Sequence, residues 1–343
     1  MNNKAASAPA PHRTDHLVAA AAWVETPLQL LSVLEAHHTG GFARHTRVLP
    51  RSGSGALDAT VAAVTAAGLP DGVDVLPSGT TPTLYRENTD TWFVGDAFSG
   101  QVQRALLRGG VREYVVVDDG LATVHLLRLL TRRVAVPLER ARVRSTPARL
   151  ALGLATAVRL RAAARAGRLT VFTVLPLPDG LRRDAAAVGI RVVEHDFAWL
   201  RALPGAAAPA ENRVVLGSAM VRDGLLHAGP YLDWVLGHAS DEPVVYYPHR
   251  REDARTLEPL NADPRIRVAS HGLPAELGLR GLRDRHRVVS LPSTAVTSLR
   301  VLLGRHGVAV EAAEVPESWW TGQAAPGLRA HLSIFVTDEK DSR

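Results

Sequence analysis

The chain has 343 residues, 46% of them hydrophobic, which suits two α/β domains with a buried core better than one. The net charge is +6 and nearly all of the positive charge is arginine, which favours acidic partners such as phosphates, nucleotides, anionic sugars or anionic lipids, although a GC-rich genome produces the same bias. The absence of cysteine excludes disulfides and thiolate metal sites. The apolar runs stop short of the roughly 18 residues of a membrane-spanning helix. The 5% aromatic content argues against nucleic acid as a partner.

The first half of the chain alternates between strand-like and helix-like runs. Residues 1–14 come first and are rich in alanine and proline, without the charged-then-apolar order of a secretion signal, so we predict a disordered start. The absence of cysteine fits a cytoplasmic protein, which is the location we expect. The predicted strands cover residues 17–23, 46–49, 73–76, 91–94, 113–117, 169–174 and 191–194. The predicted helices cover residues 28–36, 57–67, 101–107 and 121–131. This alternation is typical of parallel βαβ units and predicts an N-terminal Rossmann-like domain over residues 15–204.

Residues 203–211 contain two prolines and a run of alanines, and this composition predicts a linker over residues 205–211. The alternation then restarts, with strands predicted over residues 213–216, 243–247, 265–269, 287–291 and 308–311, and helices over residues 231–236 and 295–303. We therefore predict a second Rossmann-like domain over residues 212–325, followed by a C-terminal helix and charged tail over residues 326–343. The predicted fold class is α/β, with two Rossmann-like domains facing each other across a cleft.

An acidic pair, Asp118-Asp119, and Gly120 come directly after the strand predicted over residues 113–117. Ligands of open α/β sheets bind outside the carboxyl ends of the strands, where this turn would lie. One interpretation is a simple helix cap followed by a permissive glycine. The other is a general base, because two adjacent carboxylates raise each other's pKa. A metal site is a third interpretation, for which the chain offers no matching histidine or third acid nearby.

A basic loop, Pro248-His249-Arg250, follows the strand predicted over residues 243–247. It is either an exposed turn or a phosphate site. In a phosphate site, His249 would act as a donor or general acid because histidine carries a proton near pH 7. Arg250 would add forked donors to the same charge.

Two further motifs of the second half also follow predicted strands. Ser293-Thr294 comes after a proline and precedes the helix predicted over residues 295–303, so we expect an N-cap here in any case. The functional interpretation adds a phosphate-binding site at the same helix start. Glu276 follows Pro274 and is either a solvated helix residue or an acceptor for ribose hydroxyls.

The strand ends of the first half supply the remaining candidates. Thr26 and Gln29 follow the first strand, and Asp96 follows the strand predicted over residues 91–94. Capping alone explains Thr26, but the position of all three predicts possible substrate contacts. The chain contains neither a dinucleotide fingerprint nor a Gly-Lys-Ser/Thr phosphate loop.

Taken together, these motifs resemble those of the bacterial sialyltransferases, in particular the lipooligosaccharide sialyltransferases and capsular polysialyltransferases. That superfamily carries an acidic-acidic-Gly motif, a His-Pro motif and a Ser/Thr motif in this order. They match Asp118-Asp119-Gly120, His249 and Ser293-Thr294. The Thr-Pro-Leu-Gln element beginning at Thr26 and the Leu-Pro-x-Glu element ending at Glu276 also look like this group, so the resemblance spans residues 17–305.

The resemblance implies a GT-B fold, a CMP-sialic acid donor, inversion at the anomeric carbon, and chemistry that needs no metal or other cofactor. Asp119 would be the base with Asp118 in support, although the choice between the two stays open. His249 would protonate or stabilise the CMP phosphate, and Ser293 and Thr294 would bind it. The remaining residues assigned to donor binding are Pro248, Arg250, Pro274 and Glu276, and those assigned as possible substrate contacts are Thr26, Gln29, Asp96 and Gly120.

The chain departs from the family at its histidine motif, where Arg250 follows the histidine and the proline precedes it. This departure leaves the phosphate geometry open and allows a donor that carries another CMP-activated nonulosonic acid. The alternatives are another GT-B-type transferase that uses a different nucleotide donor, a metal-dependent transferase, and a non-catalytic nucleotide- or glycan-binding protein. The acceptor would be a glycan, glycolipid or other saccharide, and the basic composition adds the hypothesis of peripheral association with an anionic membrane surface.

Overall fold

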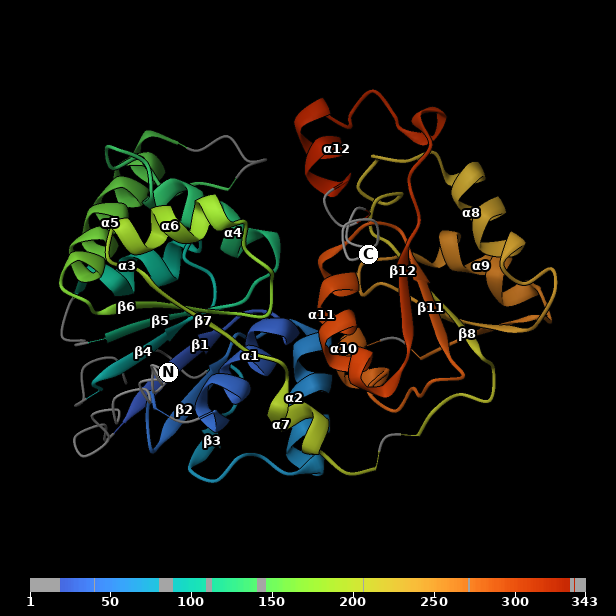
Figure 1. Ribbon diagram of the computed structural model, residues 1–343, viewed down its shortest axis with the longest axis horizontal. Helices are drawn as coiled ribbons and strands as arrows, with labels where there is room; N and C mark the ends of the chain where they lie inside the picture. Colours follow the sequence, from blue (N-terminus) through green and yellow to red (C-terminus); the bar gives the residue numbers. More distant parts are fainter. Residues whose placement is uncertain are drawn as a thin grey trace, which may run out of the picture.

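The computed structural model describes residues 19–39, 41–79, 89–108, 113–140, 146–205, 207–270, 272–333 and 336. The segment 1–14 predicted to be disordered and the charged end of the tail lie outside the described residues. The described residues form two α/β domains that stand side by side, the first in blue to yellow-green and the second in yellow to red (Figure 1).

The first domain is built on a parallel sheet with the strand order β3-β2-β1-β4-β5-β6-β7. Strands such as β1, β5 and β6 in its middle are buried on both faces and are therefore almost continuously apolar, as in other parallel sheets covered by helices, whereas the edge strands β3 and β7 are partly exposed. The strand bounds are β1 (Ala20–Val24), β2 (Thr46–Pro50), β3 (Val73–Val75), β4 (Thr91–Val94), β5 (Glu113–Val117), β6 (Leu169–Thr173) and β7 (Arg191–Glu194).

Helices cover both faces of this sheet, with α1, α2 and α7 on one side and α3 to α6 on the other (Figure 1). Several begin where the sequence places a capping residue: Thr26 precedes α1 and accepts a hydrogen bond from the Gln29 main-chain N–H, and Thr146 caps α5 in the same way. The helix bounds are α1 (Pro27–His38), α2 (Gly55–Ala67), α3 (Gly100–Arg108), α4 (Leu121–Leu130), α5 (Pro147–Arg165), α6 (Asp179–Ala187) and α7 (Ala198–Ala202).

The second domain has a smaller parallel sheet with the strand order β10-β9-β8-β11-β12. The strands are β8 (Arg213–Leu216), β9 (Val244–Tyr247), β10 (Ile266–Val268), β11 (Arg287–Ser290) and β12 (Ala309–Ala312). The helices are α8 (Ala228–Gly237), α9 (Ala254–Ala262), α10 (Ala275–Gly278), α11 (Thr294–Leu303) and α12 (Pro326–Ser333). The strand ranges expected from the sequence agree with these bounds to within a few residues.

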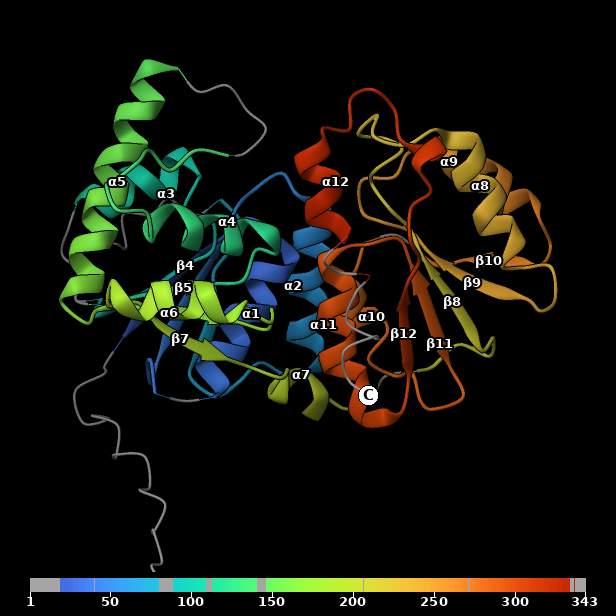
Figure 2. The ribbon, with the colours of Figure 1, turned by 45° about the horizontal axis from the view of Figure 1, so that its top comes forward.

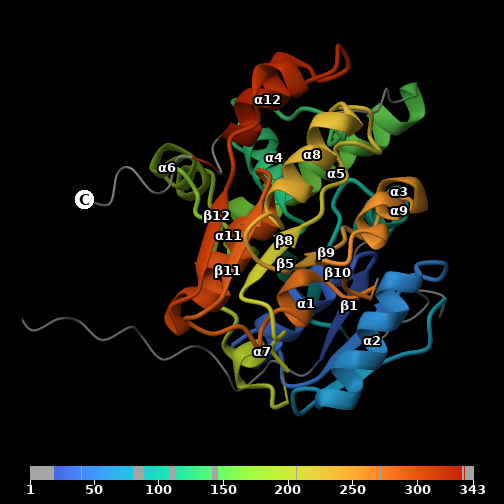
Figure 3. The ribbon, with the colours of Figure 1, turned by 90° about the vertical axis from the view of Figure 1, so that its right-hand side faces the viewer.

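The two domains pack directly against each other through helices. In the turned views, α1 and α2 of the first domain lie beside α10 and α11 of the second (Figure 2), and the second domain lies in front of the first when seen from its own side (Figure 3). One buried apolar cluster includes residues of both domains, such as Leu34 of α1 and Leu299 of α11. This shared packing fixes the strand ends of one sheet relative to those of the other.

The strand order reverses once in each sheet, between β1 and β4 in the first and between β8 and β11 in the second. In open α/β sheets such reversal points leave a crevice outside the carboxyl ends of the strands. The fold class predicted from the sequence is confirmed: the chain is α/β with two Rossmann-like domains that face each other across a cleft, the GT-B arrangement.

Candidate active site

A pocket of about 420 Å³ lies between the two domains, at the carboxyl ends of both sheets. The first domain lines it with the turns that follow β1 and β5, and the second domain lines it with the loops that follow β8, β9, β10 and β11. The residues predicted from the sequence that line this pocket are Thr26, Asp119, Gly120, Pro248, His249, Arg250, Pro274, Glu276, Ser293 and Thr294. Gln29, Asp96 and Asp118 are not among the lining residues.

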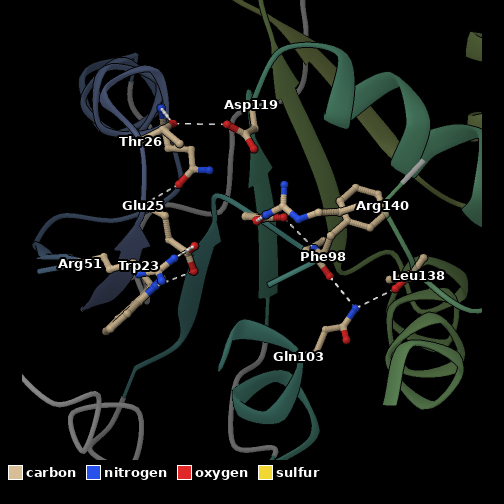
Figure 4. A network of polar contacts seen from close by, with 12 residues as sticks. Trp23, Glu25, Thr26, Arg51, Phe98, Gln103, Asp119, Leu138 and Arg140 are labelled. Atoms are coloured by element: carbon tan, nitrogen blue, oxygen red, sulfur yellow. Dashed lines mark hydrogen bonds and ion pairs between the residues drawn. The ribbon is translucent and has the colours of Figure 1, made fainter. Parts of the chain in front are cut away.

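Asp119 stands in the turn between β5 and α4, and its carboxylate faces the start of α1 (Figure 4). Its Oδ1 accepts a hydrogen bond from Thr26 Oγ1 at 3.2 Å, while its main-chain N–H donates to Thr123 Oγ1 at 3.0 Å. The N-cap of α4 is Gly120, so neither aspartate of the pair caps this helix. The carboxylate of Asp119 is therefore held at the pocket wall and remains available for chemistry.

Gly120 lets the two domains approach closely at this point. Its φ of 65° lies in the left-handed region, and a Cβ added there would stand 3.0 Å from Thr294 Oγ1 of the second domain. A larger residue would strain the backbone and push against the hydroxyl. The acidic motif and the hydroxyl motif therefore meet across the pocket.

The pKa of Asp119 is raised to about 7, first because the carboxyl is buried and second because the charge of Asp96 lies nearby. The hydrogen bond from Thr26, the nearby amide of Gln29 and the positive charge of Arg140 oppose the rise. A carboxyl with a pKa near 7 can take up a proton at neutral pH, which an ordinary aspartate does poorly. Asp119 is thus suited to act as a general base.

Asp96 follows β4 by two residues and does not line the pocket. Its side chain is only 2% exposed, accepts a hydrogen bond from the Phe98 main-chain N–H at 2.8 Å, and forms an ion pair with Arg140. Burial raises the pKa of Asp96, and Arg140 opposes that rise. The predicted substrate contact is therefore a buried charge that raises the pKa of Asp119.

Gln29 likewise lies behind the pocket wall. Its side chain is fully buried, and Oε1 accepts a hydrogen bond from the Glu25 main-chain N–H at 2.7 Å. Its amide also stabilises the charged form of Asp119. Gln29 thus shapes the turn after β1 and supports the base.

Asp118 points away from the pocket, toward the end of β6. It is fully buried, its Oδ1 accepts from Thr173 Oγ1 at 2.6 Å, and its Oδ2 accepts from the Val174 main-chain N–H at 2.5 Å. Burial raises the pKa of Asp118 to about 6. The mutual effect expected of adjacent carboxylates is not a cause of either shift, because consecutive side chains leave the strand end in opposite directions. Asp118 ties β5 to β6 and so fixes the turn that carries Asp119.

The loop after β9 presents His249 to the pocket from the second domain. Its main-chain N–H donates to Glu252 Oε2 at 2.7 Å, and its Nδ1 accepts from the Arg251 main-chain N–H at 3.1 Å. Because Nδ1 is an acceptor, the ring proton of the neutral imidazole lies on Nε2. Nε2–H is thus the atom that can donate to a ligand.

Burial, and then the charges of Arg250 and Arg251, lower the pKa of His249 to about 4. The expectation that this histidine carries a charge near pH 7 on its own therefore does not hold for this loop. A neutral imidazole can still donate one hydrogen bond, and a bound anion would raise the pKa by favouring the charged form. Arg250 also lines the pocket, where the charge of Asp119 acts on it across the cleft.

A polar network that the sequence reasoning missed holds this loop in place. The hydroxyls of Tyr231 and Tyr246 lie 2.7 Å apart, and Tyr246 donates to Glu252 Oε1 at 2.5 Å. A Cβ on Gly217 would stand 2.1 Å from Glu252 Oε2, so only glycine fits there. Glu252 lies three residues after the histidine and Tyr246 three residues before it, so nearness in the sequence was the only signal for these two. Tyr231 comes from α8 and has no motif around it.

The helix α11 begins at the pocket with its capping hydroxyl unused. Ser293 is the N-cap in an extended conformation, yet its side chain makes no capping hydrogen bond. Ser293, Thr294 and Ala295 all line the pocket. The free main-chain N–H groups of a helix start and a nearby hydroxyl are suited to bind a phosphate.

Glu276 lies at the start of α10 in the same pocket, next to Pro274. Its side chain is buried, which raises its pKa, and hydrogen bonds with its own main chain and with Ser298 oppose that rise. The solvated-residue interpretation therefore does not apply, and its carboxylate can serve as an acceptor for ligand hydroxyls.

Within the described ranges, no group of three or more histidine, aspartate or glutamate side chains is arranged to hold a metal ion. None of the described helices has the length and apolar character needed to cross a membrane.

No protein-family model matches the sequence, and no curated protein matches it. Among solved structures, the chain is similar to a UDP-glucosyltransferase from Polygonum tinctorium, with 12% identity, a TM-score of 0.47, and coverage of 97% of this chain and 84% of that chain. It is also similar to a heptosyltransferase from E. coli in complex with ADP-2-deoxy-2-fluoro heptose, with 10% identity, a TM-score of 0.39, and coverage of 83% and 86%. A third is UDP-N-acetylglucosamine 2-epimerase from Rickettsia bellii, with 11% identity, a TM-score of 0.39, and coverage of 80% and 74%. Likenesses this distant carry no argument about what the present chain binds.

Proposed function

We propose that the protein is an inverting glycosyltransferase that moves a sialic acid, or a related nonulosonic acid, from a CMP-activated donor to a hydroxyl of a glycan or glycolipid. One observation carries the proposal. Asp119 on the first domain shares a single pocket with His249, Arg250, Ser293 and Thr294 on the second. The resemblance of these motifs to those of the bacterial sialyltransferases is what selects CMP among possible nucleotides.

In the proposed reaction, Asp119 takes the proton of the acceptor hydroxyl as that oxygen attacks the anomeric carbon. The bond from this carbon to the donor phosphate breaks on the opposite face, its electron pair goes to the phosphate oxygen, and CMP leaves. Attack and departure on opposite faces invert the configuration. The raised pKa of Asp119 supports this role, and a positioned base contributes about 10²–10⁴-fold.

The leaving phosphate is assigned to the second domain. Nε2–H of His249 donates to it, Arg250 offers a planar set of donors, and the start of α11 adds main-chain N–H groups and the Ser293 hydroxyl. Donors that are already in position when charge develops are effective, and the loss of one costs about 10²–10³-fold in rate. Because these groups supply the positive electrostatic environment, the proposed reaction needs no metal or other cofactor.

The nucleoside is assigned to the floor of the pocket near α10. Glu276 lines the pocket and its side chain is buried, so we assign its carboxylate as an acceptor for ligand hydroxyls such as those of ribose. The volume of about 420 Å³ lies within the range of small-molecule sites.

Titration calorimetry with CMP tests the donor assignment without knowledge of the acceptor. We expect CMP to bind in the presence of EDTA, with UMP and GMP binding at least tenfold more weakly. Preference for UMP or GMP would contradict the CMP assignment and indicate a donor with another nucleotide. Binding that disappears with EDTA would contradict the metal-free chemistry.

Two substitutions separate the roles of the two pocket walls. S293A should weaken CMP binding because it removes a phosphate donor, whereas D119A should leave CMP binding unchanged and abolish transfer. A matched control is T256A, which removes a buried hydroxyl of the same domain that lies outside the pocket. Equal CMP affinity in S293A and the wild type would remove this hydroxyl from the site.

A further inference from the structure

Two arginines line the pocket between the domains, and they differ in what already holds them. Arg251 forms an ion pair with Asp223, in which Nη2 donates to Oδ2 at 2.5 Å. Arg250 makes no hydrogen bond or ion pair with any other residue that the structure describes, and it is exposed, so a ligand can reach it. Because arginine stays protonated in proteins, Arg250 brings a free positive charge to the pocket.

The position of Arg250 places this charge next to both halves of the proposed reaction. Arg250 directly follows His249, so the loop that brings the imidazole to the leaving phosphate also carries the guanidinium. Partial burial lowers the pKa of Arg250, and the negative charge of Asp119 on the first domain opposes this change. Opposite charges act on each other in this way over short distances, since salt screens exposed charges that lie more than about 8–10 Å apart. The guanidinium therefore lies near the groups assigned to the phosphate and near the base.

The proposed reaction determines which part of the donor lies between these groups. The anomeric carbon is bonded to the phosphate oxygen and is attacked by the oxygen that Asp119 deprotonates. In a sialic acid or another nonulosonic acid, this carbon also carries a carboxylate. In an activated aldohexose or aldoheptose, the same carbon carries a hydrogen atom instead. A negative charge on the anomeric carbon therefore distinguishes acidic-sugar donors from neutral-sugar donors.

We propose that Arg250 binds the carboxylate of the transferred sugar and thereby selects an acidic sugar over a neutral one. The inference rests on the proposed function, and it concerns the one charged group of the donor that the phosphate-binding residues do not recognise. A guanidinium presents its N–H donors in a planar fork, and parallel donors of this fork match the oxygens of a carboxylate. The N–H groups on the other edge remain for the phosphate, which is bonded to the same carbon.

The acids of the pocket give an acidic sugar a particular need for this cation. Asp119 and Glu276 both line the pocket, and the carboxylate of the sugar would lie close to Asp119, which must be charged to act as the base. Like charges at such short range repel each other strongly where water is partly excluded. Arg250 would offset this repulsion because it attracts both carboxylates. A neutral sugar would leave the guanidinium without this partner, which is how the site would discriminate against it.

Titration calorimetry with a pair of unreactive donors tests the inference on the full chain. One ligand is CMP-sialic acid with fluorine next to the anomeric carbon, which blocks transfer, and the other is its methyl ester, in which the carboxyl group has no charge. We expect the wild type to bind the free acid about tenfold to a hundredfold more tightly than the ester, which is the range for one hydrogen-bonded charge. R250Q should bind the two ligands equally. R250K should keep part of the preference because it retains the charge without the fork.

The matched control is R255Q, which removes one positive charge from an exposed position of α9 outside the pocket and should keep the wild-type preference for the free acid. Equal binding of the two ligands by the wild type, or a preference that persists in R250Q, would overturn the inference while the CMP site of the proposed function stands. A loss of CMP affinity in R250Q as large as the loss for the free acid would also overturn it, because Arg250 would then serve the phosphate alone. A wild type that binds neither CMP nor the free acid would overturn the proposed function and the inference together. Unfolding temperatures check that all variants are folded.

Discussion

The substitution D119N measures how much the buried charge of Asp119 lowers the free energy of unfolding, independently of the role of this residue in catalysis. In the folded protein the pKa of Asp119 is about 7, against an ordinary value of 3.8. The folded state therefore holds the proton more tightly than the unfolded state, and stability falls as the pH rises from 3.8 through 7. Asparagine has nearly the same shape and no charge, so D119N should be more stable than the wild type above neutral pH.

The magnitude follows from the shift of the Asp119 pKa. A difference of about 3 pK units corresponds to about 4 kcal/mol when fully expressed, which happens above pH 7. At pH 5 the Asp119 carboxyl is mostly deprotonated in the unfolded state and still protonated in the folded state. The same linkage then gives a destabilisation of about 1.7 kcal/mol at this pH. The advantage of D119N should therefore grow by roughly 2–3 kcal/mol between pH 5 and pH 8, as an upper bound.

Urea unfolding of the wild type and D119N at pH 5 and pH 8 measures this growth. The control is D74N, which removes a carboxylate from an exposed position of β3 and should change stability by the same small amount at both pH values. A D119N advantage that is equal at pH 5 and pH 8 would refute the reasoning, because the carboxylate would then not be in an environment that disfavours its charge.

Two further predictions concern the charges around the base and the fit of the histidine loop. D96N should shift the acidic limb of the pH–rate profile to lower pH because the charge of Asp96 raises the pKa of Asp119. R140Q should shift the same limb to higher pH because the charge of Arg140 lowers that pKa. Shifts of both variants in the same direction would contradict this assignment. G217A should weaken nucleotide binding at least tenfold because its Cβ would collide with the carboxylate that holds the histidine loop, while G237A, which meets nothing within 4 Å, should leave binding unchanged in the same titration.

Much of the fold and part of the site could be predicted because they depend on residue patterns within single strands, helices and turns. Alternating apolar and Ala/Leu-rich runs indicate βαβ units, and polar residues that directly follow a strand lie at the sheet edge where ligands bind. This is why Thr26, His249 and Ser293 were found before the structure, and all three line the pocket. The prediction needed only the strand ends, not the side-chain directions.

The remainder depends on contacts that no local pattern encodes. Arg140 reaches Asp96 from 44 residues away, and that ion pair helps to set the pKa of Asp119. The opposite directions of Asp118 and Asp119 depend on how β5 ends against β6. The low pKa of His249 comes from burial, which the sequence of an apparently exposed basic turn does not show.

The central claim is that Asp119 and the second-domain loops act on one CMP-activated sugar. The most direct test is the rate of CMP release from CMP-sialic acid, measured with EDTA and a panel of glycan acceptors, for the wild type and D119N. We predict acceptor-dependent release by the wild type, and CMP binding without release above background by D119N. Release by D119N at the wild-type rate would contradict the account.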